Sequence, residues 1–364
     1  MPSEIERTAR AWNAVAERGG KNSGLCWWDA GPEIHKRINR KISGDPTCDY
    51  TTYVLKKYLA KRLPVDYCLS LGCGSGSLER SLACQGAFLL CDACDIAESQ
   101  LVVAKKLAEQ EGITNINYYV ADVNKITLTA CRYDVAWMQG AMHHVKSLEH
   151  VCYQIAQALK PEGLLILNEY IGPSRFQFAA RQKEVANLCL RLLPARYRAV
   201  VQEAAVTQAE RSVRRLGVRW FASRLLDKIK DGDLLNTIQR RFRARKSRML
   251  AQAPVKMTCA FPSVRDVIAA DPSEAVRSEE IETILSRYFE ILETKELGGN
   301  ILQFLLADIA GNFSRQDEES QALLRMLIQV EETLLSCGEF RSDFAFIVGR
   351  TLIKQAAERV GSPD

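Results

Sequence analysis

The feature that most constrains the fold is a glycine-rich turn, Leu69-Ser70-Leu71-Gly72-Cys73-Gly74-Ser75-Gly76, between an apolar run and a stretch with helical spacing. Three glycines at alternate positions permit a tight turn and let a ligand approach the backbone. The start of the following helix offers free N–H groups to an anion. The spacing GxGxG differs from the GxGxxG of dinucleotide-binding dehydrogenases, so we expect a ligand carboxylate here rather than a pyrophosphate.

From residue 65 onward, short apolar runs alternate with helical stretches. The strand-like runs lie at residues 65–71, 87–94, 115–121, 133–138, 164–167, 288–297 and 344–348. Helical spacing separates the early runs, and two apolar helices near 301–309 and 321–335 separate the last two. Strands that alternate with helices in this way predict a parallel sheet covered on both faces. The predicted fold class is α/β, a doubly wound and mainly parallel sheet of seven strands.

Two aspartates end the strand-like runs that follow the glycine turn. Asp95 ends the second run and Asp122 ends the third. The first acid can accept hydrogen bonds from both ribose hydroxyls, and the second can accept one from an adenine amino group. Either aspartate alone would be explained as a helix cap. Together with the turn, they predict a nucleoside site at the switch point of the sheet.

At these motifs the sequence resembles the class I S-adenosylmethionine-dependent methyltransferases, in the small-molecule branch with type 11 or type 12 domains. The resemblance covers about residues 65–170, and it implies that S-adenosylmethionine is the cofactor. The glycines would pack against its methionine part, Asp95 would bind the ribose and Asp122 the adenine. The cofactor-binding positions that it implies are Ser70, Gly72, Cys73, Gly74, Gly76, Asp95, Ile96, Asp122, Val123 and Gln139.

Two positions depart from the family pattern. The family usually has an acid where Ser70 stands and a glycine where Glu162 stands. The serine removes one expected contact near the amino end of the cofactor, although its hydroxyl remains. Glu162 lies in an outer turn, where we expect no effect on the site.

The candidate catalytic residues follow the fourth and fifth strands. A hydroxyl acceptor needs a base to remove its proton, which is normally His, Asp or Glu. His143 and His144 follow the fourth strand, and Glu169 ends the fifth. Packing below the sheet or a turn cap would explain one of the histidines equally well, and solvation at a strand end would explain Glu169. The candidate substrate-binding residues are Tyr170, Arg175 and Arg277.

Charge is distributed unevenly along the chain. Residues 175–256 hold 20 Lys and Arg against 6 Asp and Glu, whereas the rest of the chain is acidic. This asymmetry indicates that the basic segment meets an anion. Three alternatives stay open: a lid that grips an anionic small substrate, a helix on a membrane surface around Trp220 and Phe221, and a nucleic-acid contact through residues 240–248. A solvated helical pair that only covers the active site would also explain it.

Four regions follow from these patterns. Residues 1–64 form a helical N-terminal cap, and 65–175 form the Rossmann-like core that binds S-adenosylmethionine. Residues 176–262 form the basic helical insertion, and 263–364 complete the sheet and carry a helical insert. The N-terminus lacks a signal-peptide pattern and no apolar run reaches 20 residues, so a cytoplasmic protein is expected. The 12 cysteines are scattered and the pair Cys91 and Cys94 has no second pair, so no metal site is expected.

The predicted function is methyl transfer from S-adenosylmethionine to a small molecule, most simply to an oxygen of a sugar or related metabolite. No Asn-Pro-Pro-Tyr or Asp-Pro-Pro-Tyr stretch follows the fourth strand, which argues against methylation of base or amide nitrogens. One alternative is an RNA methyltransferase that uses the basic insertion. Another is a non-catalytic protein that holds the cofactor at a membrane surface or for a partner. The sequence leaves the oligomeric state open.

Overall fold

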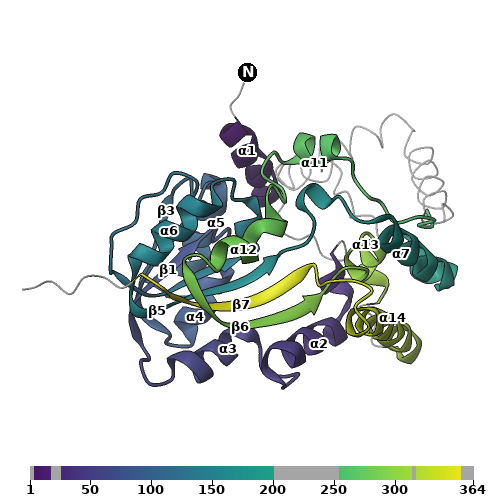
Figure 1. Cartoon of the computed structure of the whole chain (residues 1–364), viewed down its shortest axis with the longest axis horizontal. Helices are drawn as coiled ribbons and strands as arrows, with labels where there is room; N and C mark the ends of the chain where they lie inside the picture. Colours follow the sequence, from purple (N-terminus) through teal and green to yellow (C-terminus); the bar gives the residue numbers. More distant parts are fainter. Residues whose placement is uncertain (1–3, 18–25, 201–253, 314–316, 354–364) are drawn as a thin grey trace, which may run out of the picture.

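The computed structural model describes residues 4–17, 26–200, 254–313 and 317–353. Within these ranges seven strands form one sheet in the order β3-β2-β1-β4-β5-β7-β6 (Figure 1). The strands are β1 (Val65–Leu71), β2 (Phe88–Asp95), β3 (Ile116–Val120), β4 (Tyr133–Gln139), β5 (Leu159–Tyr170), β6 (Phe289–Gly298) and β7 (Phe344–Thr351). Strands β1 to β5 are parallel to one another, and β7 is antiparallel to both β5 and β6. The predicted fold class is therefore confirmed.

The strand order reverses direction between β1 and β4. The chain runs outward from β1 through β2 to β3, then returns to the other side of β1 for β4 and β5. The carboxyl ends of β1 and β4 therefore diverge into helices on opposite faces, and a crevice opens between them. The turn after β1 and the turn after β4 both lie at this crevice.

Helices and short helical turns surround the sheet. The longer helices are α1 (Glu4–Glu17), α2 (Pro32–Ser43), α4 (Ser77–Cys84), α5 (Glu98–Gln110), α6 (Leu148–Ala158), α7 (Ala180–Leu192), α11 (Val264–Ala270) and α14 (Glu318–Ser336). The shorter ones are η1 (Trp27–Ala30), α3 (Tyr50–Val54), η2 (Leu55–Leu59), η3 (Met142–His144), η4 (Ser174–Phe176), η5 (Ala195–Arg198), η6 (Ser278–Glu280), α12 (Ile281–Leu285), α13 (Leu302–Leu306) and η7 (Ala310–Asn312).

Each strand contributes alternate side chains to two separate hydrophobic cores, as the period of a strand requires. In β1, Leu69 and Leu71 are buried in the core that α6 and α12 cover. Cys68 is buried in the core that α3, α4 and α5 cover. Because both faces are buried, the central strands are almost continuously apolar, which is why they were recognisable in the sequence.

A third hydrophobic core lies beside the sheet rather than on it. It joins η1, α7, α13 and α14 around Trp27, Leu190 and Leu305, and Tyr170 at the end of β5 belongs to it. Figure 1 shows α7, α13 and α14 gathered at one end of the molecule. This cluster forms one wall of the space above the carboxyl end of β5.

Two predicted elements differ from the structure in length. The helix expected near 301–309 is reduced to α13, because the chain is extended at Ala307 and Asp308 is left-handed with φ +63°. The strand expected at 164–167 begins at Leu159, because a shift in register between β4 and β5 lets the chain pair before and after an irregular turn.

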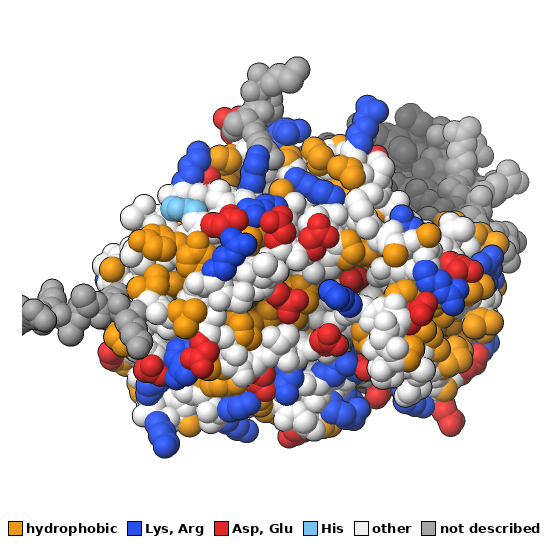
Figure 2. All heavy atoms as spheres, in the orientation of Figure 1, with side chains coloured by type: hydrophobic (Ala, Val, Ile, Leu, Met, Phe, Trp, Pro, Cys, Tyr) orange, Lys and Arg blue, Asp and Glu red, His pale blue; other side chains and the backbone are white. Residues whose placement is uncertain are grey.

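Most of the basic insertion, residues 201–253, lies outside the described residues, and so do Trp220, Phe221 and the arginines of 240–248. Figure 2 shows Lys and Arg interspersed with Asp and Glu over the described part of one face. None of the helices in the described ranges combines the length and the apolar character that crossing a bilayer requires.

Candidate functional site

A cleft of about 1410 Å³ opens at the carboxyl ends of the central strands. Nine of the ten predicted cofactor positions line it: Ser70, Gly72, Cys73, Gly74, Asp95, Ile96, Asp122, Val123 and Gln139. His143, His144 and Tyr170 line the same cleft. Residues predicted separately to bind cofactor and to act on substrate are thus brought to one cavity.

The glycine turn has a backbone that side chains would obstruct. Gly72 has φ +71°, and a Cβ built on it would lie 2.5 Å from the Cβ of Ala141. Gly76 has φ +73° and precedes the first residue of α4. It is the one predicted cofactor position that does not line the cleft, so its part is to let the chain enter α4.

Asp95 organises the turn from the end of β2. One of its carboxylate oxygens accepts a hydrogen bond of 2.9 Å from the N–H of Gly74, and the other accepts one of 2.8 Å from the N–H of Ala97. Burial raises the pKa of Asp95, although these N–H groups oppose the rise. The carboxylate therefore holds the turn in shape and still faces the cleft.

Asp122 carries an oxygen that is ready to accept a hydrogen bond. Its Oδ1 accepts from the N–H of Asn124 at 3.0 Å. Its Oδ2 is buried and has no hydrogen-bond partner among the described residues. A buried carboxylate oxygen without a donor is costly, so a ligand amino group at this point would be favourable. Across the cleft, the Tyr50 hydroxyl donates a hydrogen bond of 2.7 Å to Gln139, which fixes that amide at the end of β4.

Ser70 is paired with a buried acid that also lines the cleft. Its hydroxyl donates a hydrogen bond to Oε1 of Glu79, which lies in the first turn of α4. Glu79 is 1% exposed and also lines the cleft. Burial raises the pKa of Glu79 to about 7. The family resemblance implies an acid at position 70, where Ser70 stands, and implies no role for position 79.

His143 is held by a carboxylate beneath it. Its Nδ1 pairs with Oε1 of Glu169, which also accepts from the N–H of Tyr170. The other oxygen of Glu169 accepts from the N–H groups of Ala141 and Met142. The Glu169 side chain has no exposed surface and is not part of the cleft lining. Glu169 was predicted as a catalytic residue, and the structure places its carboxylate against His143 rather than on the cleft surface.

His144 is held by a separate set of partners. Its Nδ1 lies 3.1 Å from Oγ of Ser273, and that hydroxyl donates to Asp271 at 2.8 Å. The serine hydroxyl must then accept from Nδ1–H of His144, which leaves the lone pair of this imidazole on Nε2. The indole ring of Trp12 from α1 packs edge-on against His144 at 5.2 Å and donates a hydrogen bond of 3.0 Å to Asp271.

Glu274 brings the two histidines together. Its carboxylate lies 3.4 Å from Nε2 of His143 and 4.0 Å from Nε2 of His144. Burial lowers the pKa of His143, but the carboxylates of Glu169 and Glu274 outweigh this and raise it to about 10. Burial and the positive charge of His143 lower the pKa of His144 to about 4. One imidazole is therefore a cation at neutral pH and its neighbour is neutral.

The same three side chains have a spacing that could hold a divalent cation. One ligand atom from each of His143, His144 and Glu274 lies within 4.8 Å of the others. Among the described residues, this is the one cluster of His, Cys, Asp and Glu side chains that is close enough to hold a metal ion. Both ring nitrogens of His143 already face carboxylates, so a metal would have to displace the proton between His143 and Glu274.

The two predicted substrate-binding arginines lie elsewhere. Arg175 donates hydrogen bonds of 2.7 and 2.9 Å to the backbone carbonyls of Pro272 and Glu274, and it fixes the loop that presents Glu274. Arg277 forms ion pairs of 2.8 and 2.6 Å with Glu149 and Glu280. Neither guanidinium lines the cleft. The guanidinium of Arg175 is hydrogen-bonded to backbone carbonyls, and that of Arg277 is paired with carboxylates. Tyr170 does line it, and its hydroxyl donates to the carbonyl of Pro173 at 3.0 Å.

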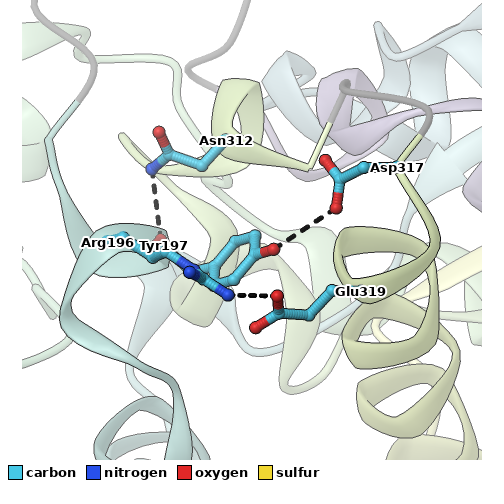
Figure 3. Close-up of a pocket in the computed structure, with 5 residues that line it drawn as sticks. All are labelled: Arg196, Tyr197, Asn312, Asp317 and Glu319. Carbon is cyan, nitrogen blue, oxygen red and sulfur yellow. Dashed lines mark hydrogen bonds and ion pairs between the residues drawn. The ribbon is translucent and has the colours of Figure 1, made fainter.

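A second, smaller pocket of about 250 Å³ lies far from these residues in the sequence (Figure 3). Its lining side chains bind one another. Tyr197 donates to Asp317 at 3.4 Å, Arg196 pairs with Glu319, and Asn312 donates to the Tyr197 carbonyl at 3.1 Å. These groups are already paired with one another, and their interactions connect η5, η7 and the start of α14.

Comparisons with known proteins agree with this geometry. Residues 69–167 match the family model described as a methyltransferase domain. The ubiquinone biosynthesis O-methyltransferase of Coxiella burnetii (strain RSA 493) is 32% identical over 114 residues, which are 31% of this chain and 47% of that protein. The enzyme of the same name from Acinetobacter baylyi is 33% identical over 128 residues, 35% of this chain and 52% of that protein.

The chain thus spans about half the length of the curated relatives it matches. Among solved structures, phosphoethanolamine N-methyltransferase 2 of Haemonchus contortus in complex with S-adenosyl-L-methionine has 13% sequence identity and a TM-score of 0.45. That match covers 93% of this chain and 60% of the other.

The residues of the cleft fit S-adenosylmethionine. The glycine turn has an unobstructed backbone, Asp95 faces the cleft from the end of β2, and Asp122 has a buried oxygen that lacks a donor. The matched segment contains all of these positions and runs from β1 to β5. Residues 69–167 are therefore a methyltransferase domain of the class I S-adenosylmethionine-dependent family.

Proposed function

We propose that the protein transfers a methyl group from S-adenosylmethionine to an oxygen of a small molecule, such as a hydroxyl of a sugar or related metabolite. The observation that carries the proposal is the pairing of two sites in one cleft. The cofactor motifs lie at the ends of β1, β2 and β3. His143 and His144, which follow β4, line the same cleft together with Glu274 from the loop before η6. A hydroxyl held between the two sites has both a methyl donor and a destination for its proton.

The cleft has room for both molecules and a wall suited to an organic acceptor. Aromatic side chains line it on the acceptor side, as is usual for small-molecule sites. These residues are Trp27, Trp28, Tyr170, Phe176 and Phe344. The expected small-molecule substrate is therefore one that combines a hydroxyl with an apolar or ring surface. The sequence-based expectation of an anionic substrate rested on arginines that the structure places outside this lining or that lie outside the described residues.

When bound, the cofactor supplies an activated methyl group, so the protein acts mainly by position. The glycine turn, Asp95 and Asp122 would hold it. His144 is neutral and presents the lone pair of Nε2, so it accepts the proton of the acceptor hydroxyl. The charged His143 beside it favours the oxyanion that forms as the proton leaves. Glu169 keeps that imidazole fixed, and the carboxylate of Glu274 stabilises the proton on His144.

The test combines binding with turnover. Calorimetry should show that S-adenosylmethionine and S-adenosylhomocysteine bind to the purified protein, and that Asp95→Ala abolishes this binding. Asp66→Ala is the matched control, since Asp66 is exposed at the opposite end of β1. This variant should bind both compounds as the wild type does. A panel of sugars and phenols is then incubated with cofactor labelled in its methyl group.

Label on a hydroxyl of one of these acceptors would support the proposal. Binding without transfer to any acceptor would support the alternative of a protein that only holds the cofactor. Transfer to RNA, weakened by salt, would support an RNA methyltransferase, which depends on residues outside the described ranges. Lack of cofactor binding by the intact folded protein would overturn the proposal.

A further inference from the structure

One buried acid in the cleft has a carboxylate oxygen that receives no hydrogen bond within the described part of the chain. Glu79 lies in the first turn of α4, where an acid is normally exposed and interacts favourably with the helix N-terminus. Here it is 1% exposed. Oε1 accepts the hydroxyl hydrogen of Ser70, whereas Oε2 is buried and has no hydrogen-bond partner among the described residues.

The charges around Glu79 compensate its carboxylate only in part, because Arg80 lowers its pKa while Asp95 raises it. The nearest basic residue on its own helix, Arg80, donates a hydrogen bond of 2.6 Å to the carbonyl of Ser75 and pairs with Glu111 at 3.1 Å. Asp95 adds a second negative charge on the same side of the cleft, and burial of Glu79 raises its pKa to about 7. A buried carboxylate in such a place is stabilised when a cation binds against it.

We propose that Glu79 binds the ammonium group of the methionine part of S-adenosylmethionine. The inference rests on the proposed function only for the identity of the cofactor, and it is independent of the acceptor. A methionine part carries one carboxylate and one ammonium. The N–H groups of the glycines in the turn already donate to Cys94, Asp95 and Cys73, so the carboxylate would bind at the start of α4. Glu79 is the acid that the structure places beside that turn. Ser70 then orients Glu79 instead of binding the cofactor itself.

A structural role for Glu79 makes different predictions. If Glu79 only stabilised the start of α4 or the position of Ser70, its loss would weaken the binding of every ligand of the cleft alike. If it binds the ammonium group, its loss would weaken only those ligands that carry that group. The comparison of two ligands therefore separates the two roles.

The experiment uses the full chain and two probes. S-adenosylhomocysteine contains the amino acid, and 5′-methylthioadenosine shares the nucleoside and the thioether but lacks the ammonium. Glu79→Gln keeps the shape and the hydrogen bond with Ser70. We expect it to weaken S-adenosylhomocysteine about 10- to 100-fold, the usual effect of losing a hydrogen bond between charged groups. The affinity for 5′-methylthioadenosine should stay within about twofold by the same argument.

A second variant moves the acid instead of removing it. Ser70→Asp combined with Glu79→Ala places a carboxylate on the neighbouring strand, and it should recover most of the lost affinity for S-adenosylhomocysteine. Should Glu79→Gln fail to fold, the wild-type protein gives the same information. Its affinity for S-adenosylhomocysteine should rise between pH 6 and 7.5 as Glu79 ionises, while that for 5′-methylthioadenosine stays constant.

An unchanged affinity for S-adenosylhomocysteine in Glu79→Gln would overturn the inference, and so would an equal loss for both ligands. Failure of the proposed function would look different, because the wild-type protein would then bind neither ligand. Thermal unfolding of each variant identifies any loss of binding that is due to loss of the fold.

Discussion

At the residue scale, the neighbouring histidines differ in protonation because their surroundings differ. His143 pairs directly with Glu169, and this carboxylate and Glu274 raise its pKa. Burial and the charge of His143 lower the pKa of His144, although Asp271 and Glu274 lie 3.6 and 4.0 Å from its ring nitrogens. The sequence could place both after the fourth strand, but it could not rank them. Ser273 is separated from His144 by 129 residues, and that serine decides which ring nitrogen carries the hydrogen.

His144→Gln tests this assignment. We expect kcat to fall by about 10²- to 10⁴-fold, the usual contribution of a positioned proton acceptor. The affinity for S-adenosylhomocysteine should be unchanged, because the cofactor positions are intact. Steady-state kinetics with an acceptor of the wild-type protein give the first value and calorimetry the second. His150→Gln is the control, since His150 bonds to the carbonyl of Ile126 and does not line the cleft. Equal loss of kcat in both variants would contradict the assignment.

Because Asp343 has a raised pKa, we predict that the stability of the protein depends on pH. Burial raises its pKa to about 7, and the nearby Glu331 adds to the rise, although Gln182 and Gln303 donate to its carboxylate. The folded state therefore binds this proton more tightly than the unfolded chain, whose pKa is near 3.8. The resulting stability is fully present below about pH 4 and is lost as the pH rises through 7.

Urea unfolding of the wild type and of Asp343→Asn between pH 5 and 8 checks this expectation. As the pH rises, the unfolding free energy of the wild type should fall more steeply than that of the variant. The difference in slope should be up to about 1.4 kcal/mol per pH unit. Asn keeps an oxygen for the two glutamine amides but cannot ionise. Glu79 titrates in the same range in both proteins, so only the difference between them reports Asp343. Parallel curves for the two proteins would show that Asp343 is not protonated in the folded state.

At the element scale, the sheet was predictable and the arrangement around it was not. Runs such as Val65–Leu71 are apolar because both faces of a central strand are buried, and an aspartate or a glycine marks their ends. Arg175 and Arg277 lie outside the cleft lining. The sequence shows the charge of each guanidinium, but it does not show the carbonyls and carboxylates with which each one pairs. Glu274 could not be found from the sequence, because a loop held by Arg175 brings it to His143 and His144 from about 130 residues away.

The link between α2 and α14 is an element-scale contact with a large predicted effect. Arg37 of α2 pairs with Glu331 of α14 at 2.7 Å, and the Glu331 side chain is fully buried. Glu331 also accepts from the N–H groups of Gly299, Ile301 and Leu302. This carboxylate therefore joins the end of β6, α13 and α14 to the N-terminal cap.

Arg37→Met should lower the unfolding free energy by about 3 kcal/mol or more, because it leaves a buried carboxylate without its cation. Urea unfolding measures the change. Arg37→Met combined with Glu331→Gln should regain part of the loss, since no unpaired charge then remains. Lys36→Met is the control, because Lys36 forms an exposed pair with Glu33 that is worth about 0.5 kcal/mol or less. A loss in Arg37→Met no larger than in the control would contradict the prediction.

At the scale of the whole molecule, the cleft is assembled from distant parts of the chain. The N-terminal helix α1, the turn after β4 and the loop before η6 meet at Asp271. Thr8 donates to it at 3.2 Å and Trp12 at 3.0 Å, while Asn13 accepts from Ser99 of α5. Since Thr8 and Trp12 also line the cleft, α1 covers the region where the cofactor and acceptor sides meet.

This arrangement predicts that α1 opens when its hydrogen bonds to Asp271 are removed. Thr8→Ala combined with Trp12→Phe keeps most of the packing and removes both donors. At about 1 kcal/mol for each hydrogen bond, the amides of α1 should exchange with deuterium about 10- to 30-fold faster. Amides of α14 serve as the internal control, because no contact of that helix is changed. Unchanged exchange in α1 would mean that packing against α5 alone holds the cap, whereas the expected acceleration would make Asp271 the residue that couples the cap to the support of His144.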